Sequence, residues 1–145
     1  MKFSVEAVCI SNEKGVQKHE VPQIVLRQGH GIEGDAHAGP WHRQVSLLAG
    51  EAVDTMKARG LELAAGAFGE NIVTRGVDWT QASVGEIIQI DDVSLEITQI
   101  GKECHSRCAI YYAAGDCIMP RQGIFTKVLK GGTIHAQSCG DYRIG

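Results

Sequence analysis

Hydrophobic and polar residues alternate in several short stretches, and this alternation predicts a domain built mainly from β-strands. The pattern runs over residues 3–9 and again over 20–27, where Pro22 lies near the strand start, a position that tolerates a missing backbone donor. The most regular stretch is 85–101, in which alternating apolar residues flank Asp91-Asp92, so we expect a hairpin with its turn at these aspartates. Shorter β-prone segments lie at 71–74, 133–136 and 142–144.

Helical spacing is confined to two short segments. Apolar residues recur at helical intervals over 50–59, with Glu51 in the first turn and Gly60 placed to cap the end. A second short helix is expected over 124–130, stopped by the glycine pair that follows it. Because strands outnumber helices, we expect a mostly β fold. A β-barrel-like domain with a few short helices is the natural closure, since it leaves no exposed strand edge.

Length and composition are those of an ordinary soluble domain. The 145 residues suffice for a single domain, 1–145, and 43% of them are hydrophobic. A net charge of -3 argues against a duplex nucleic-acid binder, which needs a basic face. The N-terminus does not resemble a signal peptide, and no apolar run is long enough to suggest a membrane span. Five cysteines, an odd number, favour free thiols in a reducing cytoplasm over a disulfide framework.

Three of these cysteines lie in one segment, Gly101–Pro120 (GKECHSRCAIYYAAGDCIMP), and they are the main candidates for chemistry. They are Cys104, Cys108 and Cys117. A thiol reacts as its thiolate, which neighbouring cations stabilise. The cations within three residues of Cys104 are Lys102, His105 and Arg107. A soft thiolate can hold a metal such as copper, zinc or molybdenum, or carry sulfur as a persulfide. By contrast, Cys9 lies in an alternating strand and is expected to be a core residue.

Two other chemistries compete for the same cysteines. Cys104 and Cys108 could bind structural zinc, with further ligands from Cys117, Cys139, His105 or His135. Structural zinc sites usually present two closely spaced pairs, and the sequence has no second pair. A cysteine hydrolase would use Cys104 as nucleophile and His37 or His135 as base, but the sequence shows no signature of an oxyanion site.

Glycine-rich segments supply the candidate binding loops. Gly29–Arg43 (GHGIEGDAHAGPWHR) contains three histidines, and its glycines would let the backbone approach an anion closely. Arg43 could add a forked guanidinium to a phosphate. The spacing matches neither a Walker loop nor a dinucleotide-binding motif. A second segment, Gly66–Asn71 (GAFGEN), offers Glu70 and Asn71. Taken alone, each segment is more often a structural turn than a binding site.

Several segments, in order, resemble the MOSC domain, the module named for the C-terminal region of molybdenum-cofactor sulfurases. They are GIEGDAHAG (31–39), GAFGENIVTRG (66–76), VGEIIQI (84–90), LEITQIGKEC (95–104) and GIFTKVLKGGTI (123–134), followed by Gly140-Asp141. The resemblance covers nearly the whole chain, and the features around CHSRC and GDCIMP are most like small bacterial members of the molybdenum pathway. It implies a β-barrel-like fold with a few short helices, in agreement with the periodicity.

The resemblance also assigns roles to residues. The reactive cysteine of the family, proposed to carry sulfur or to bind molybdenum, maps onto Cys104, with Cys108 a near-equal candidate and Cys117 a third participant. The implied cofactor is the molybdenum cofactor, molybdopterin, with its pterin phosphate held by the glycine-rich loop. The cofactor-binding candidates are Gly34, Asp35, His37, Arg43, Glu70, Asn71, Arg107 and Arg121, with Lys102 as a further anion contact.

Two departures narrow the expected function. Many members have proline immediately before the reactive cysteine, where this chain has Glu103. The redox members also carry an additional N-terminal barrel domain, for which this chain is too short. We therefore expect a cytoplasmic carrier or cofactor-handling protein rather than a complete reductase, with sulfur transfer or molybdenum-dependent redox chemistry as its activity. Expected partners are molybdenum cofactor biosynthesis proteins or a sulfur donor such as a cysteine desulfurase. A zinc-stabilised binding module is the alternative.

Overall fold

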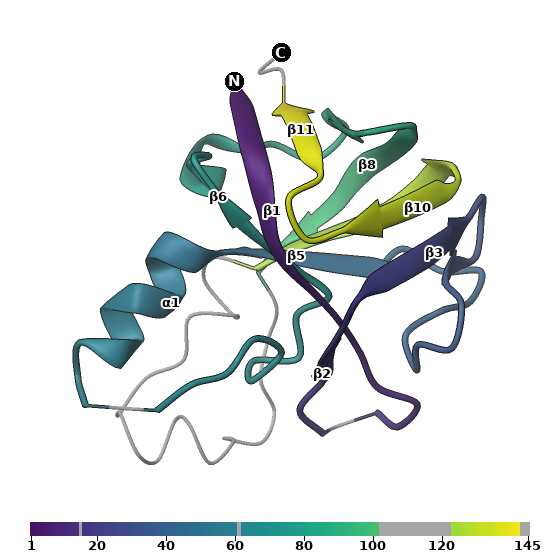
Figure 1. Cartoon of the computed structure of the whole chain (residues 1–145). Helices are drawn as coiled ribbons and strands as arrows, with labels where there is room; N and C mark the ends of the chain where they lie inside the picture. Colours follow the sequence, from purple (N-terminus) through teal and green to yellow (C-terminus); the bar gives the residue numbers. More distant parts are fainter. Residues whose placement is uncertain (15, 61, 102–122, 143–145) are drawn as a thin grey trace.

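Seven strands close into a mixed β-barrel (Figure 1). The computed structural model describes residues 1–14, 16–60, 62–101 and 123–142. Around the barrel the strand order is β11 (Cys139–Tyr142), β7 (Ile87–Ile90), β8 (Val93–Ile100), β9 (Ile124–Lys130), β5 (Val45–Ala49), β6 (Ile72–Arg75) and β1 (Lys2–Ile10). The ring closes where β1 pairs with β11, with Ser4 opposite Cys139. The pairing of β5 with β6 is parallel, and the other described barrel pairings are antiparallel. The expected mostly β, barrel-like fold is confirmed.

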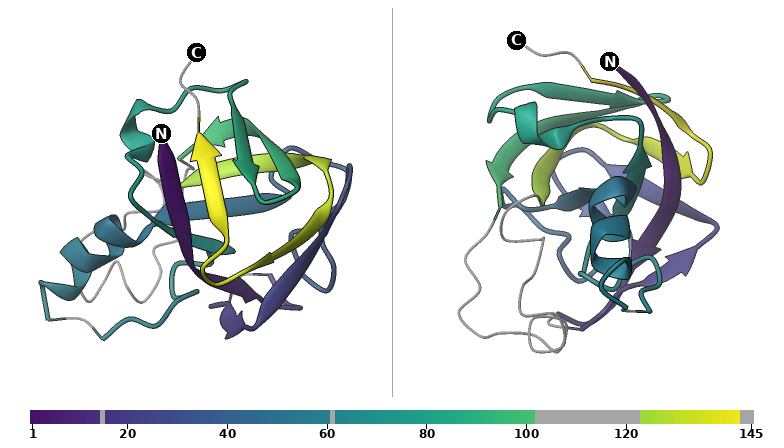
Figure 2. Two further views of the ribbon diagram at one scale, coloured as in Figure 1. Left: turned by 45° about the horizontal axis from the view of Figure 1, so that its top comes forward. Right: turned by 90° about the vertical axis from the view of Figure 1, so that its left-hand side faces the viewer.

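A smaller three-stranded sheet lies beside the barrel (Figure 2). It consists of β10 (Gly132–His135), β3 (Gln23–Arg27) and β4 (Gly31–Ile32). The preceding strand, β2 (His19–Val21), instead pairs with the end of β1. The sequence predicted one strand over 20–27, but the chain changes sheet at Pro22, which has no backbone N–H to continue a ladder. The expected strand therefore forms as two.

Hydrophobic side chains form two clusters, one inside the barrel and one outside it. The inner cluster gathers alternate residues of the barrel strands, including Val45, Leu47 and Ile124. The outer cluster contains Leu48, Phe68 and Phe125, together with the apolar side of α1 (Gly50–Lys57). Neighbouring residues of β5 and β9 thus face opposite sides, as pleated strands require. The outer cluster packs the helix and the 63–68 segment against the barrel wall.

Most expected elements are confirmed. The helix predicted over 50–59 is α1, and Gly60 closes it through a hydrogen bond from its N–H to the carbonyl of Lys57 (2.9 Å). The hairpin with its turn at Asp91-Asp92 is β7 and β8. Strand β6 corresponds to the β-prone segment at 71–74, and β10 to that at 133–136. The last segment forms slightly earlier than predicted, as β11, and part of 142–144 lies outside the described residues.

The helix predicted over 124–130 is wrong. This segment is β9, paired on one side with β8 and on the other with β5. Ile124, Thr126 and Val128 are buried at alternate positions, and β-branched residues fit a pleated strand better than a helix turn. Backbone pairing with β5 and β8 on both sides stabilises the strand more than the weak helical spacing favours a helix. A short 3-10 helix, Trp79–Gln81, lies between β6 and β7. Among the helices described, none is long and apolar enough to cross a membrane.

Candidate functional site

The glycine-rich loop is anchored by a buried carboxylate, Asp35. Its Oδ1 atom accepts hydrogen bonds from Lys18 Nζ (2.6 Å) and from the backbone N–H of Ser11 (3.2 Å). Its Oδ2 atom accepts from the backbone N–H of His37 (3.1 Å). The carboxylate is fully buried and every oxygen has a donor, so Asp35 fixes the loop to the connection between β1 and β2. Gly34, which precedes it, is exposed.

Lys18 connects the two glycine-rich segments, although no pattern in the sequence points to it. Its side chain is only 1% exposed, and Nζ lies 2.9 Å from His37 Nδ1 as well as 2.6 Å from Asp35. Its backbone N–H donates to the carbonyl of Gly66 (2.9 Å). Lysine is rarely buried without a charged partner. A lysine in a polar stretch carries no periodic signal, and only the folded chain brings it to Asp35.

Cationic and imidazole side chains surround one indole, and we call Lys14, His37, Trp41, His42 and Arg43 the Trp41 cluster. The His37 ring stacks on Trp41 with an interplanar angle of 7° and a centroid separation of 6.3 Å. The Arg43 guanidinium carbon lies 4.7 Å from the Trp41 centroid, and Lys14 Nζ lies 5.6 Å from it. Trp41 Nε1 donates to the carbonyl of His37 (2.7 Å), which fixes the indole in the loop. The cluster concentrates positive charge on a protein whose net charge is -3.

Arg43 is the side chain in this cluster best suited to meet an anion. Its guanidinium lies against two rings, Trp41 at 4.7 Å and Phe125 at 5.7 Å. Its Nε atom is buried, and within the described part of the chain it has no hydrogen-bond partner. A buried donor without a partner costs about 1–3 kcal/mol. A carboxylate or phosphate oxygen that accepts a hydrogen bond from this Nε–H would remove that cost.

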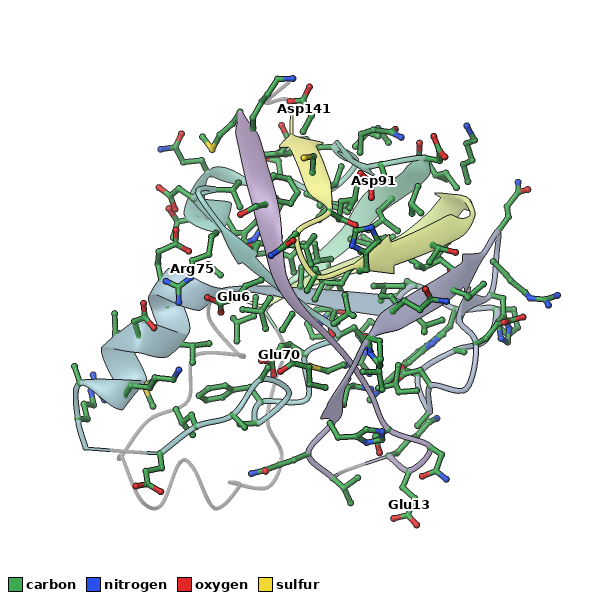
Figure 3. The ribbon with its side chains drawn as sticks, viewed as in Figure 1. Glu6, Glu13, Glu70, Arg75, Asp91 and Asp141 are labelled. Atoms are coloured by element: carbon green, nitrogen blue, oxygen red, sulfur yellow. The ribbon has the colours of Figure 1, made fainter. Side chains whose placement is uncertain are left out.

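Glu70 and Asn71 are both buried and bonded to the chain itself. Glu70 accepts hydrogen bonds from the backbone N–H groups of Gly66 (3.1 Å) and Phe68 (3.0 Å), which closes the 66–70 turn within the body of the molecule (Figure 3). Burial raises the pKa of Glu70, although its backbone hydrogen bonds and the nearby Lys18 act in the opposite direction. Asn71 accepts from Ser46 and donates to the carbonyl of Cys9, so it joins β5 to β1.

The segment with the candidate cysteines begins and ends at one place on the barrel. Gly101 follows β8, and its N–H donates to the carbonyl of Gly123 (2.7 Å), which precedes β9. Next to this point, His42 Nε2 lies 2.9 Å from Gln99 Oε1. Phe125, which contacts Arg43, is two residues beyond Gly123. The Trp41 cluster is therefore adjacent to the stem of the cysteine segment. The candidates outside the described residues are Lys102, Cys104, His105, Arg107, Cys108, Cys117 and Arg121.

Two cysteines fall within the described residues. Cys9 is completely buried, as predicted, and burial raises the pKa of its thiol to about 12. Cys139 is exposed at the start of β11. Within the described ranges, no three histidine, cysteine, aspartate or glutamate side chains come together to hold a metal ion. The zinc alternative depends on Cys104 and Cys108 and stays a prediction.

Of the candidates in the glycine-rich loop, His37 and Arg43 meet at Trp41, Asp35 anchors the loop and Gly34 is exposed. Glu70 and Asn71 lie on the segment that contacts Lys18. The aromatic residues were missed. Trp41 lies between Pro40 and His42, next to Arg43, and an aromatic side chain beside a cation in a glycine-rich loop was a usable signal. Phe125 was assigned to a helix, so its contact with Arg43 had no signal in the sequence.

Comparisons with solved structures support the fold. The chain is similar to the YuaD protein from Bacillus subtilis, at 17% identity over 97% of this chain and 94% of that chain, with a TM-score of 0.80. It is also similar to YiiM from Escherichia coli (18% identity, 99% of this chain, 70% of that chain, TM-score 0.67). YiiM from Geobacillus stearothermophilus gives 16% identity over 97% of this chain and 75% of that chain, with a TM-score of 0.70. At these identities the likeness shows the fold alone.

A comparison with curated protein sequences found no match. The sequence model of the MOSC domain, in contrast, matches residues 33–138, which include the glycine-rich loop from Glu33 onward, the barrel strands β5 to β9 and the cysteine segment. This chain therefore belongs to the MOSC domain family, which is associated with proteins of the molybdenum cofactor.

Proposed function

We propose that this protein handles the molybdenum cofactor: it binds the pterin phosphate at the Trp41 cluster and presents a cysteine thiolate to the metal or carries sulfur on it. The observation that carries the proposal is Arg43. A guanidinium held against Trp41 and Phe125, with a buried Nε that has no partner in the described chain, is a cation prepared for an external anion. It lies beside the stem of the segment that contains Cys104 and Cys108.

The residues of the cluster fit the anionic part of such a cofactor. Arg43 supplies the fixed charge, and His37 supplies a ring nitrogen in the same loop. Asp35 holds the backbone of His37, whereas Glu70 closes the 66–70 turn and Asn71 joins β5 to β1. When bound, molybdenum would supply redox or sulfur-transfer chemistry. In this proposal Cys104 is the metal ligand or the sulfur-carrying thiol, with Cys108 and Cys117 as further candidates and Arg107 and Arg121 as further anion contacts.

The decisive experiment is anaerobic incubation with freshly released molybdenum cofactor, followed by gel filtration and measurement of co-eluting metal and pterin. Wild type should retain both. Arg43→Gln should weaken retention about 10- to 100-fold, because one hydrogen bond to a charged group contributes about 1.5–3 kcal/mol. Arg59→Gln is the matched control, since Arg59 is an exposed arginine just past α1. Equal retention by the two variants would remove Arg43 from the site, and no retention by wild type would overturn cofactor binding.

Cysteine variants separate the two forms of the proposal. Cys104→Ser should keep the pterin and lose the metal if the thiolate is a molybdenum ligand. If the protein instead carries sulfur, incubation with a cysteine desulfurase and isotopically labelled cysteine should place labelled sulfur on Cys104 or Cys108. A Cys104→Ser/Cys108→Ser double variant that still retains metal and still accepts sulfur would contradict both forms. Stoichiometric zinc in the purified protein, with loss of folding on chelation, would favour the zinc-stabilised module.

A further inference from the structure

Lys18, Asp35 and His37 form a buried chain of charges next to the proposed anion site. Lys18 Nζ lies between the two partners, 2.6 Å from Asp35 Oδ1 and 2.9 Å from His37 Nδ1. The Lys18 and Asp35 side chains are 1% and 0% exposed, whereas His37 is 34% exposed. The imidazole thus has one side toward a buried ammonium and lies against Trp41. Nδ1 is the ring nitrogen that faces the Lys18 ammonium.

A lysine ammonium is a hydrogen-bond donor with no acceptor. At 2.9 Å from it, Nδ1 of His37 can only accept, so this nitrogen carries no hydrogen. A neutral imidazole holds its single hydrogen on one of its two nitrogens, which leaves Nε2 as the protonated atom. The alternative would place the proton on the ring and leave Lys18 as a neutral amine.

The surrounding charges favour the ammonium. Asp35 strengthens this preference, because its nearest oxygen is 2.6 Å from Lys18 Nζ but 3.9 Å from His37 Nδ1. Glu70 also acts on Lys18 electrostatically. Around the ring, Arg43 and Lys14 near Trp41 oppose a positive imidazole.

We infer that Lys18 is a positioning residue that holds His37 as the neutral imidazole with its hydrogen on Nε2. The loop then contains one fixed cation at the indole, Arg43, and a neutral nitrogen donor at His37. The position of Lys18 also depends on the second glycine-rich segment, because its backbone packs against Gly66. The carbonyl of Lys18 would lie 2.2 Å from a Cβ atom at Gly66, and the two backbones are hydrogen-bonded. Only glycine at 66 lets the segments approach closely enough to seat the lysine.

This assignment of the tautomer stands without any ligand, but its use in binding rests on the proposed function. A phosphate at the Trp41 cluster would meet a neutral donor rather than an imidazolium. Binding of inorganic sulfate, a probe that stays a dianion over this range, to a His42→Gln variant should therefore not strengthen between pH 8 and pH 6. Failure of cofactor retention would leave the tautomer untouched, and a wrong tautomer would leave cofactor retention untouched, so the two failures are distinguishable.

Long-range proton–nitrogen NMR on histidine-labelled protein tests the assignment directly. The His37 signals are identified by their loss in His37→Gln. At pH 7 the two ring nitrogens should have widely separated shifts with the hydrogen on Nε2. This pattern should persist to at least one pH unit below the ordinary histidine pKa of about 6.5. An imidazolium, or a hydrogen on Nδ1, in the wild-type spectrum at pH 7 would overturn the inference.

Variants separate positioning from a general structural role. Lys18→Met removes the ammonium and leaves His37 beside the Asp35 carboxylate. The pKa of the His37 imidazole should therefore rise by at least one pH unit relative to wild type. Lys18→Arg keeps a charged donor and should restore the wild-type spectrum. Lys57→Met is the control, because Lys57 is an exposed lysine in the last turn of α1. A Lys18→Met spectrum identical to wild type would refute the role of Lys18. If Lys18→Met does not fold, the wild-type and Lys18→Arg spectra still decide the question.

Discussion

Asn71 offers a sharp test of whether a residue in a family motif binds ligand or holds the barrel together. Its Oδ1 atom accepts hydrogen bonds from the backbone N–H (3.0 Å) and hydroxyl (3.2 Å) of Ser46, and Nδ2 donates to the carbonyl of Cys9 (3.0 Å). Asn71→Ala removes all three, while the backbone hydrogen bonds of Asn71 to the same two residues remain. The buried N–H of Ser46 and the buried carbonyl of Cys9 then lose the partners that the Asn71 side chain gave them.

The magnitude follows from those two groups. A buried donor or acceptor left without a partner costs about 1–3 kcal/mol, so Asn71→Ala should lower the free energy of unfolding by about 2–6 kcal/mol. That is a large share of the roughly 5–15 kcal/mol typical of a domain. With a urea dependence of about 2 kcal/mol per molar, the unfolding midpoint should fall by about 1–3 M.

Urea unfolding, followed by circular dichroism and tryptophan fluorescence, measures this loss. Asn12→Ala is the matched control, because Asn12 is exposed and surface changes usually stay within about 0.5 kcal/mol. If Asn71→Ala were as stable as Asn12→Ala, the bracing role deduced from the hydrogen bonds would be wrong. A stable Asn71→Ala that no longer retained cofactor would instead make Asn71 a ligand contact.

Three further predictions concern the same region. Gly66→Ala should destabilise the protein more than Gly69→Ala in urea unfolding. Both glycines have positive φ, but only a Cβ atom at position 66 would strike a backbone carbonyl oxygen, that of Lys18, at 2.2 Å. Equal losses of unfolding free energy in the two variants would contradict this. Burial raises the pKa of Glu70, so the contribution of Glu70 to stability should fall as the pH rises from about 4.3, the pKa in the unfolded chain, through the higher pKa of the folded protein. Glu70→Gln should remove this pH dependence from the free energy of unfolding measured at pH 4–8. Parallel pH profiles for wild type and Glu70→Gln would argue against it. Under native conditions a thiol reagent should modify exposed Cys139 and spare Cys9, whose pKa is raised to about 12, as mass spectrometry of the alkylated peptides would show; modification of Cys9 before unfolding would refute its burial.

Elements with strong local periodicity could be predicted from the sequence. The 85–101 hairpin and the 50–59 helix were predictable, because each shows a repeat that only one kind of element satisfies and a turn or glycine that ends it. Segment 124–130 was not, since a short apolar run is consistent with either element. Its two neighbours, β5 and β8, are distant in sequence, and they made it a strand.

The candidate site divides in the same way. Residue type and glycine spacing pointed to Asp35, His37 and Arg43, because anion-binding chemistry is visible in local sequence. What each of them meets was decided by the tertiary structure. No pattern in the sequence distinguishes Lys18. It becomes the partner of His37 only because Gly66, in a distant segment, can pack against the backbone of Lys18. Likewise, β9 carries Phe125 to Arg43, since close packing and charge pairing join residues that no sequence interval relates.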